Sequence, residues 1–298
     1  MIDILMPYYG DPMLLRAAVQ SVLDQDNPDW RLVVVDNDYP DRTPGTWVEQ
    51  LGDSRVRYLR NERNLGVSGN LRRCLELAEA SHFVIMGADD LLHPNYVSVI
   101  REAVSLHGDV TMVQPKVRVI DQDGAVINPL GDRIKTVLAP RRNGTHLLAG
   151  ERLAASLLRG NWLYFPALTW NRSKIAGRTF RDDMETVFDL DFVMELIISG
   201  ASMALLETEA FSYRRHASSV SSLTARDTAR FEEESRLFDE LVPRLVHAGW
   251  TKAARAARWH TTSRLHAATL LPGALSSGDT GIARLLTRHV VGLPGGRL

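Results

Sequence analysis

Short apolar runs alternate with amphipathic stretches along the first ninety residues. Runs at residues 2–6, 32–35, 56–59 and 83–86 predict strands, because an apolar run of this length bounded by turn residues is typical of a strand buried on both faces. Residues 14–23 and 67–78 place their apolar side chains on one helical face. The pattern therefore predicts an α/β fold with a mostly parallel sheet flanked by helices.

The pattern becomes less regular in the second half of the chain. A strand at 211–216, helices at 95–106 and 151–159, and a helix that begins at Asp189 and ends before Gly200 are expected. Residues 128–150 show little periodicity, so we expect a long loop that is either a lid with cations for a diphosphate or simply solvated. We expect a domain at 1–222, divided near residue 120, and a C-terminal helical extension at 223–298.

The extension is expected to contain three amphipathic helices, and its charge sets it apart. The first should begin near Thr224 and be bent or ended by Pro243. The second should cover 251–270, and the third should cover 280–291. The net charge of the chain is −1, yet residues from Pro243 onward carry +7. This asymmetry favours an anionic partner, such as a membrane surface or a phosphorylated acceptor, or a solvated helix face. Packing on the domain, or against a second copy of the chain, is a further alternative to a membrane surface.

Composition excludes several classes of protein. The single cysteine, Cys74, leaves no disulfide framework and no cysteine-based zinc site. No basic leader precedes the first strand, and no apolar run approaches the roughly 18 residues that span a bilayer. We therefore expect a cytoplasmic protein, either free or peripheral at the inner face of the membrane. We expect no nucleic-acid partner.

The strand at 83–86 stops on Gly87-Ala88-Asp89-Asp90. Ligand-binding residues of open α/β sheets lie at the carboxyl ends of strands, and paired carboxylates there favour a hard cation that carries phosphate. The alternative is an Asp pair that caps the next helix. His216 directly follows two arginines, which favours a third metal ligand or a donor to a diphosphate.

Two other strand ends carry residues suited to a nucleotide. Tyr8 follows the first strand and is placed to stack on a base. Asp36 follows the second strand and is placed to accept from the imide N–H of a uracil or thymine, although an ordinary turn Asp is the alternative. The sequence has neither a P-loop nor a dinucleotide-binding glycine motif, so metal and side chains must hold any phosphate.

Two acids and a group of aromatic residues complete the candidate chemistry. Asp189 and Asp191 stand at the start of a predicted helix, where a carboxylate either favours the helix dipole or acts as a general base. Trp162, Phe165 and Pro166 belong to an aromatic-rich segment that forms either a platform for a sugar ring or part of the core.

Six short motifs, in this order, resemble those of family-2 glycosyltransferases, which have a GT-A-type fold. The resemblance covers residues 2–222. The motifs are Met6-Pro7-Tyr8-Tyr9, Val33-Val34-Val35-Asp36-Asn37, Asn64-Leu65-Gly66-Val67-Ser68-Gly69-Asn70, Met86-Gly87-Ala88-Asp89-Asp90, Phe188-Asp189-Leu190-Asp191-Phe192 and Tyr213-Arg214-Arg215-His216.

The resemblance implies an inverting, metal-dependent transfer of a sugar from a nucleotide-diphosphate donor to a hydroxyl of a sugar, a lipid-linked molecule or a small molecule. The pyrimidine contact expected of Asp36 favours UDP or dTDP as the donor nucleotide. Asp89 is implied to bind Mn²⁺ or Mg²⁺, Asp90 to lie near the ribose or the metal, and His216 to contact the diphosphate or the metal. Asp189 is implied as the base, with Asp191 as the alternative. The nucleoside is implied to contact Pro7, Tyr8, Asp36, Asn64 and Asn70, and we expect Tyr9 and Asp89 to contact the nucleotide as well. We expect acceptor or diphosphate contacts from Trp162, Phe165, Pro166, Arg214 and Arg215.

Two other functions fit parts of the sequence. A sugar-1-phosphate nucleotidyltransferase has a related sheet and uses Asp-bound Mg²⁺, but its Gly-rich basic loop is missing after the first strand. A non-catalytic nucleotide-sugar-binding module is the second rival, because Gly87 and Phe188 replace acids that are usual in the family.

Overall fold

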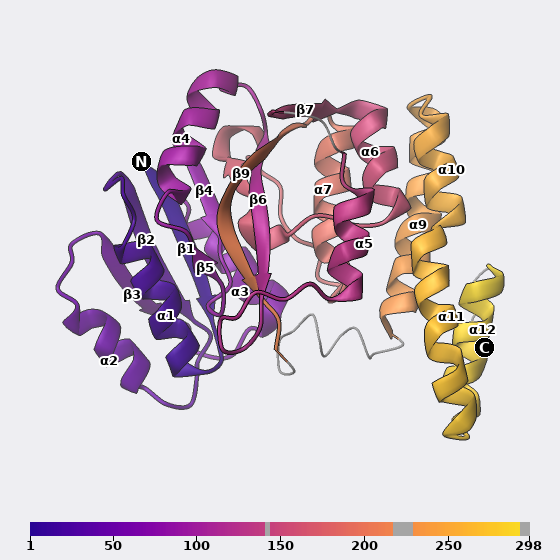
Figure 1. Ribbon diagram of the computed structural model, residues 1–298, viewed down its shortest axis with the longest axis horizontal. Coiled ribbons are helices and arrows are strands. Elements are labelled where there is room, and N and C mark those ends of the chain that lie inside the picture. Colours follow the sequence, from indigo (N-terminus) through magenta and orange to yellow (C-terminus); the bar gives the residue numbers. More distant parts are fainter. Residues whose placement is uncertain (141–143, 217–228, 293–298) are drawn as a thin grey trace.

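One mixed sheet forms the centre of the molecule. The computed structural model describes residues 1–140, 144–216 and 229–292 of the chain. Within these residues the strands form one sheet in the order β3-β2-β1-β4-β8-β6-β9-β5, with β7 paired to β9. Helices cover both faces, and the C-terminal helices stack beyond one edge (Figure 1). The predicted α/β fold with a helical C-terminal region is confirmed.

The first half of the sheet is parallel. It contains β1 (Ile2–Tyr8), β2 (Trp30–Asp36), β3 (Val56–Arg60) and β4 (His82–Ile85). The register pairs Tyr8 with Asp36 and Asp36 with Arg60, so these three strand ends lie side by side. The connecting helices are α1 (Pro12–Leu23), α2 (Thr43–Gln50) and α3 (Gly66–Leu77). Helix α2 was not predicted from the sequence, because it has only eight residues and few of them are buried.

The second half of the sheet is mixed. Strand β8 (Thr169–Asn171) runs antiparallel to both β4 and β6 (Met112–Ile120), and β6 pairs in parallel with β9 (Ser202–Arg214). The short β5 (Leu91–Leu92) pairs antiparallel with β9. Helix α4 (Tyr96–His107) and two 3₁₀ turns, η1 (Phe165–Ala167) and η2 (Arg172–Lys174), complete this part. Strand β9 therefore delivers Arg214 beside the chain that follows β4.

The expectation of a long loop without secondary structure at 128–150 is wrong. Residues Leu130–Leu138 form α5, and His146–Ala149 form β7, which pairs with β9. Helix α5 was not predicted because most of its apolar side chains do not face the core: Leu130 and Val137 are each 70% exposed, and Leu138 packs against the core only partly buried. The other inward-facing residues are polar, with Asp132 buried and Lys135 partly buried.

Two apolar layers cover the two faces of the sheet. One lies against α1 and α4, and the other against α3, α6 (Gly150–Arg159) and α7 (Phe188–Ile198). Helix α9 (Ala229–His247) and α10 (Thr251–Trp259) join this second layer, in which Leu237, Leu241 and Leu245 of α9 are fully buried. The division at residue 222 stays a prediction, but the first helices beyond it share a core with α6 and α7.

The last two helices are α11 (Thr261–Ser276) and α12 (Thr280–Val291). The third expected helix is confirmed with its bounds. The second, expected at 251–270, is instead two helices, because His260 takes a φ of 26° and so interrupts the helix. Pro243 lies inside α9 and does not end it. No helix among the described residues has the length and apolar character needed to cross a membrane.

Candidate active site

Asp36 anchors the ends of the parallel strands. Its side chain is 0% exposed and accepts hydrogen bonds from the Tyr39 N–H at 2.7 Å, from the Tyr58 hydroxyl and from Arg60 at 3.0 Å. The charge of Asp36 helps to raise the pKa of Tyr58 to about 12, after the larger effect of burial. The expected contact with a base stays a prediction, and it would have to use a carboxylate already bonded to three donors.

Tyr9, not Tyr8, offers an open aromatic face. The Tyr8 ring is 1% exposed, packs 5.2 Å from Tyr39, and its hydroxyl donates to the Gly10 carbonyl at 3.0 Å. Tyr9 is 54% exposed and meets the other side of Tyr39 edge-on. A ring as buried as Tyr8 has no free face for a base, so the expected stacking by Tyr8 is wrong in this structure. The neighbouring Pro7 is partly buried.

Asparagine side chains link the end of β2 to the start of α3. Asn70 is buried and donates to the Val35 carbonyl at 3.0 Å, and its side-chain oxygen accepts from Asn61. Asn64 accepts from Asn37 at 2.9 Å and from the Gly66 N–H at 2.8 Å. These amides fix the turn that starts α3, with Asn64 exposed at its tip.

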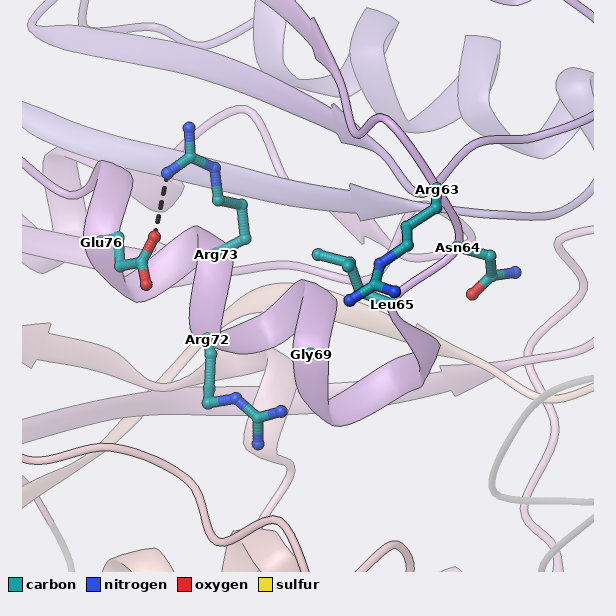
Figure 2. Close-up of a pocket in the computed structure, with 7 residues that line it drawn as sticks. All are labelled: Arg63, Asn64, Leu65, Gly69, Arg72, Arg73 and Glu76. Atoms are coloured by element: carbon teal, nitrogen blue, oxygen red, sulfur yellow. Dashed lines mark hydrogen bonds and ion pairs between the residues drawn. The ribbon is translucent and has the colours of Figure 1, made fainter.

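A pocket of about 400 Å³ lies against this turn and along α3 (Figure 2). Asn64 and Gly69 line it, and a side chain at Gly69 would collide with Leu65, because a Cβ there would lie 2.8 Å from the Leu65 Cβ. The cationic side chains at the pocket are Arg63, Arg72 and Arg73. The pocket borders the expected nucleoside end of the site, and its lining includes neither Asp89 nor Asp189.

Asp89 and His216 meet across the sheet. His216 Nε2 lies 2.8 Å from Asp89 Oδ2, and the Asp89 side chain is 32% exposed. Asp90 turns inward, where its Oδ1 accepts the Arg214 N–H at 2.8 Å. Burial, and then the charge of Asp89, raises the pKa of Asp90 well above its usual range. A Cβ at Gly87 would lie 2.7 Å from oxygens of both carboxylates, which explains why glycine stands there.

The donor set at this point fits a divalent metal in part. Asp89 and His216 face each other, whereas Asp90 is occupied by the backbone of Arg214. Among the described residues no group of three or more His, Cys, Asp or Glu side chains could hold a metal ion. A metal here would therefore need oxygen ligands from outside the protein, such as diphosphate and water, beside a carboxylate and an imidazole.

Arg214 and Arg215 are engaged by the protein itself. Arg214 is 4% exposed, and its guanidinium donates to the carbonyls of Asp89 at 2.7 Å and Gln122 at 2.8 Å. Arg214 thus ties the end of β9 to the Asp89 motif, and the expected diphosphate contact is wrong for this buried side chain. Arg215 makes a two-pronged ion pair with Asp132 of α5, at 2.6 Å and 2.9 Å. Its role toward acceptor or diphosphate stays a prediction.

Asp189 and Asp191 face different surroundings. Asp189 Oδ2 lies 3.5 Å from the Asn161 amide nitrogen, and burial raises the pKa of Asp189 while the charge of Lys135 opposes that shift. Asp191 is 4% exposed and lies 3.6 Å from Arg181 on the side of α9. Asp189 therefore lies near residues of α5, whereas Asp191 forms an ion pair with Arg181.

Helix α5 contributes residues that the sequence analysis did not single out. Tyr164 donates its hydroxyl to Asp132 at 2.9 Å, and Lys135 donates to the Leu163 carbonyl at 2.8 Å while its ammonium lies 4.5 Å from the Tyr164 ring centre. Burial lowers the pKa of Lys135 to about 8. Asp132 and Lys135 are three residues apart in the sequence, and that spacing of opposite charges was the available signal.

The aromatic group belongs mainly to the core. Trp162 is 1% exposed and its indole N–H donates to Ser156 at 2.9 Å. Phe165 packs between Trp170 at 5.9 Å and Phe180 at 5.7 Å. A sugar platform formed by Trp162 is therefore wrong, because that ring has no accessible face. Pro166, beside Phe165 in η1, is partly exposed, and its acceptor contact stays a prediction.

The model of glycosyl transferase family 2 matches residues 3–160, which is more than half of the chain. The chain belongs to this family. Curated relatives of this family-2 glycosyltransferase share a low identity with it. An uncharacterized protein of Mycobacterium tuberculosis, MT1568, is 24% identical over 87% of this chain and 81% of its own length. The Escherichia coli UDP-Glc:alpha-D-GlcNAc-diphosphoundecaprenol beta-1,3-glucosyltransferase WfgD is 26% identical to this chain over a matched region. That region covers 42% of this chain and 49% of WfgD.

Solved structures share the fold of this family-2 glycosyltransferase. Staphylococcus aureus TarS 1–349 in complex with UDP-GlcNAc has a TM-score of 0.65 at 12% identity, over 99% of this chain and 93% of TarS 1–349. The mannosyltransferase PcManGT of Pyrobaculum calidifontis, in complex with GDP-Man and Mn²⁺, has a TM-score of 0.63 at 16% identity, over 97% of this chain and 79% of its own. These likenesses agree with a GT-A-type fold for the chain.

Proposed function

We propose that this protein is an inverting, metal-dependent glycosyltransferase that moves a sugar from a UDP- or dTDP-sugar to an acceptor hydroxyl. The observation that carries the proposal is the placement of its acids on two separate elements. Asp89 follows β4 and meets His216, whereas Asp189 begins α7 and faces α5. One acid is thus available for the diphosphate side and another for the acceptor side.

The donor half of the proposal assigns Asp89 and His216 to a metal-bound diphosphate. A divalent cation bound there would act as a Lewis acid and stabilise the charge on the departing diphosphate. An imidazole beside a carboxylate favours Mn²⁺ over Mg²⁺, which prefers an all-oxygen shell. Asn64 and Tyr9 are exposed beside the end of β1 and the start of α3, and we assign them to the nucleoside.

The acceptor half assigns the base to Asp189. The carboxylate takes the proton of the acceptor hydroxyl as its oxygen attacks the anomeric carbon from the face opposite the diphosphate. The new C–O bond forms as the sugar–phosphate bond breaks, and the electron pair leaves with the diphosphate, so the anomeric centre inverts. A raised pKa suits this role, because a base whose pKa lies closer to the working pH accepts a proton more readily.

The proposal is tested by thermal unfolding with UDP, dTDP, GDP and CMP, each with and without Mn²⁺. A ligand at 100 times its dissociation constant stabilises the folded protein by about 2.7 kcal/mol, which is measurable. Stabilisation by UDP or dTDP that requires Mn²⁺ supports the proposal. Stabilisation by GDP alone would shift the donor to a purine nucleotide, and no response to any nucleotide would contradict it.

The two rival functions are weakened to different extents. Membership of a glycosyltransferase family argues against a sugar-1-phosphate nucleotidyltransferase. Only an activity measurement distinguishes a non-catalytic binding module from a transferase. Release of UDP from UDP-GlcNAc that is lost in Asp189→Asn would exclude the module. Binding of the nucleotide sugar without any turnover would favour the module.

A further inference from the structure

Helix α7, which carries Asp189, begins without a cap of its own. The residue at its N-cap position is Val187, whose side chain has no hydrogen-bonding group, and no side-chain cap bond forms there. The first N–H groups of a helix have no partner within it, so a buried helix start needs acceptors from elsewhere. Within α7 the Asp189 Oδ1 accepts the Leu190 N–H at 2.7 Å, and the turn directly before the helix takes its acceptor from a distant part of the chain.

Glu233 of α9 supplies that acceptor. Its Oε2 accepts the Thr186 N–H at 2.8 Å and the Thr186 hydroxyl at 2.6 Å, and its Oε1 accepts the Glu185 N–H at 3.1 Å. Burial alone would raise the pKa of Glu233, yet these hydrogen bonds outweigh that effect and lower it. The carboxylate therefore holds the turn at 185–187 directly before the helix that carries Asp189.

We propose that Glu233, in the first turns of α9, is a positioning residue for the base of the proposed transferase, because it holds the turn from which α7 begins. The inference rests on the proposed function. It places part of the catalytic apparatus beyond residues 3–160, which the family model matches, and beyond residue 222, where the motif resemblance ends. Glu233 does not touch the substrate in this account.

The geometry of Glu233 is tested with Glu233→Ala and the matched control Glu232→Ala, whose side chain is exposed on the same helix. The assay is UDP release from UDP-GlcNAc with Mn²⁺, well below the unfolding midpoint of each variant. Misplacement of a catalytic group by about 1 Å can lower a rate roughly 100-fold, so we expect kcat to fall about 10- to 100-fold with KM for the donor unchanged. Glu232→Ala should match the wild type.

A purely structural role for Glu233 predicts a different result. In that case Glu233→Ala lowers the unfolding midpoint, but the folded variant keeps the wild-type kcat, and the inference is wrong. Equal loss of kcat in Glu232→Ala would also overturn it. A wild-type protein that neither binds UDP nor releases it contradicts the proposed function instead, so the two failures are distinguishable.

Discussion

The two ends of the proposed site are built in different ways. At the end of β2, Asp36 and Asn70 are bonded to neighbours within the first seventy residues, mostly on adjacent strands and their turns. The start of α7, in contrast, is held by Glu233, while Asn161 and Lys135 act on Asp189. The donor end is therefore a local construction, and the acceptor end is an assembly of distant segments.

This difference separates binding from chemistry. A change at the donor end should alter nucleotide affinity, because its side chains lie along one edge of the sheet. A change at the acceptor end should alter turnover and leave nucleotide affinity intact, because α7 and the residues that hold it belong to other parts of the chain. The following variants test that separation.

The largest expected effect is that of Asp189→Asn. The amide cannot accept the proton of the acceptor hydroxyl, so transfer should fall about 10²- to 10⁴-fold while UDP binding is retained. The matched control is Asp191→Asn, which alters an acid packed near Arg181. Calorimetric titration with UDP and Mn²⁺, together with UDP release, gives both quantities. A larger loss of turnover in a folded Asp191→Asn would identify Asp191 as the base.

Asp89→Ala tests the opposite end. Loss of a carboxylate metal ligand should lower Mn²⁺-dependent UDP affinity by roughly 100-fold, because the metal contributes several kcal/mol at the diphosphate. Asp90→Asn is a useful comparison, since an asparagine oxygen can still accept the Arg214 N–H. Metal-dependent affinity that is unchanged in Asp89→Ala would remove Asp89 from the metal site.

The pH dependence of turnover should follow the ionisation of Asp189. Burial raises the pKa of Asp189, so the carboxyl holds its proton to a higher pH than an exposed Asp does. The base form is present above that pKa and is lost as pH falls through it, by about tenfold per pH unit. Lys135, whose pKa is about 8, keeps its charge at neutral pH and limits the rise. A kcat/KM profile that is flat on the acid side would contradict this assignment.

Asp132→Asn should reduce stability as well as turnover. It removes the negative charge and one of the two oxygens that accept from Arg215 and Tyr164 and so link α5 to the end of β9. Removing one partner of a buried ion pair costs about 3–5 kcal/mol, and the partial exposure of Arg215 reduces the expected loss to about 2 kcal/mol. Urea unfolding measures it, and a loss below about 0.5 kcal/mol would show that this link is unimportant.

The smallest effect is expected from Tyr9→Ala. If the exposed ring stacks on the base, its removal should weaken UDP binding by about 1 kcal/mol, or roughly fivefold. The control Tyr8→Phe removes only the bond to the Gly10 carbonyl and should leave UDP affinity unchanged. UDP affinity that is unchanged in Tyr9→Ala under the same conditions would remove Tyr9 from the nucleotide site.

Sequence patterns were informative where structure is local. The parallel strands, α3 and α12 follow from apolar periodicity, and the Asp89 motif follows from a strand that ends on two acids. The pattern failed at α5, because Leu130 and Val137 face solvent and the residues that hold the helix are Asp132 and Lys135. It could not show Glu233 at the start of α7, because a contact across 47 residues leaves no local periodicity.

Exposure was also beyond the reach of the pattern. Tyr8 and Trp162 have the right chemistry for a base and a sugar, and yet each is 1% exposed. Aromatic residues at strand ends and in short turns serve the core and the site equally well in sequence. Only the packing of Tyr39 and Ser156 against them decides the matter.

The most direct test compares the wild type with Asp189→Asn for release of the nucleoside diphosphate from UDP-GlcNAc, or from another UDP- or dTDP-sugar, at saturating donor and Mn²⁺. The account predicts metal-dependent release by the wild type and a loss of about 10²- to 10⁴-fold in the variant, with equal donor affinity. Equal release by the two proteins would contradict Asp189 as the base. Loss of donor affinity in the variant would contradict the separation of the two ends of the site.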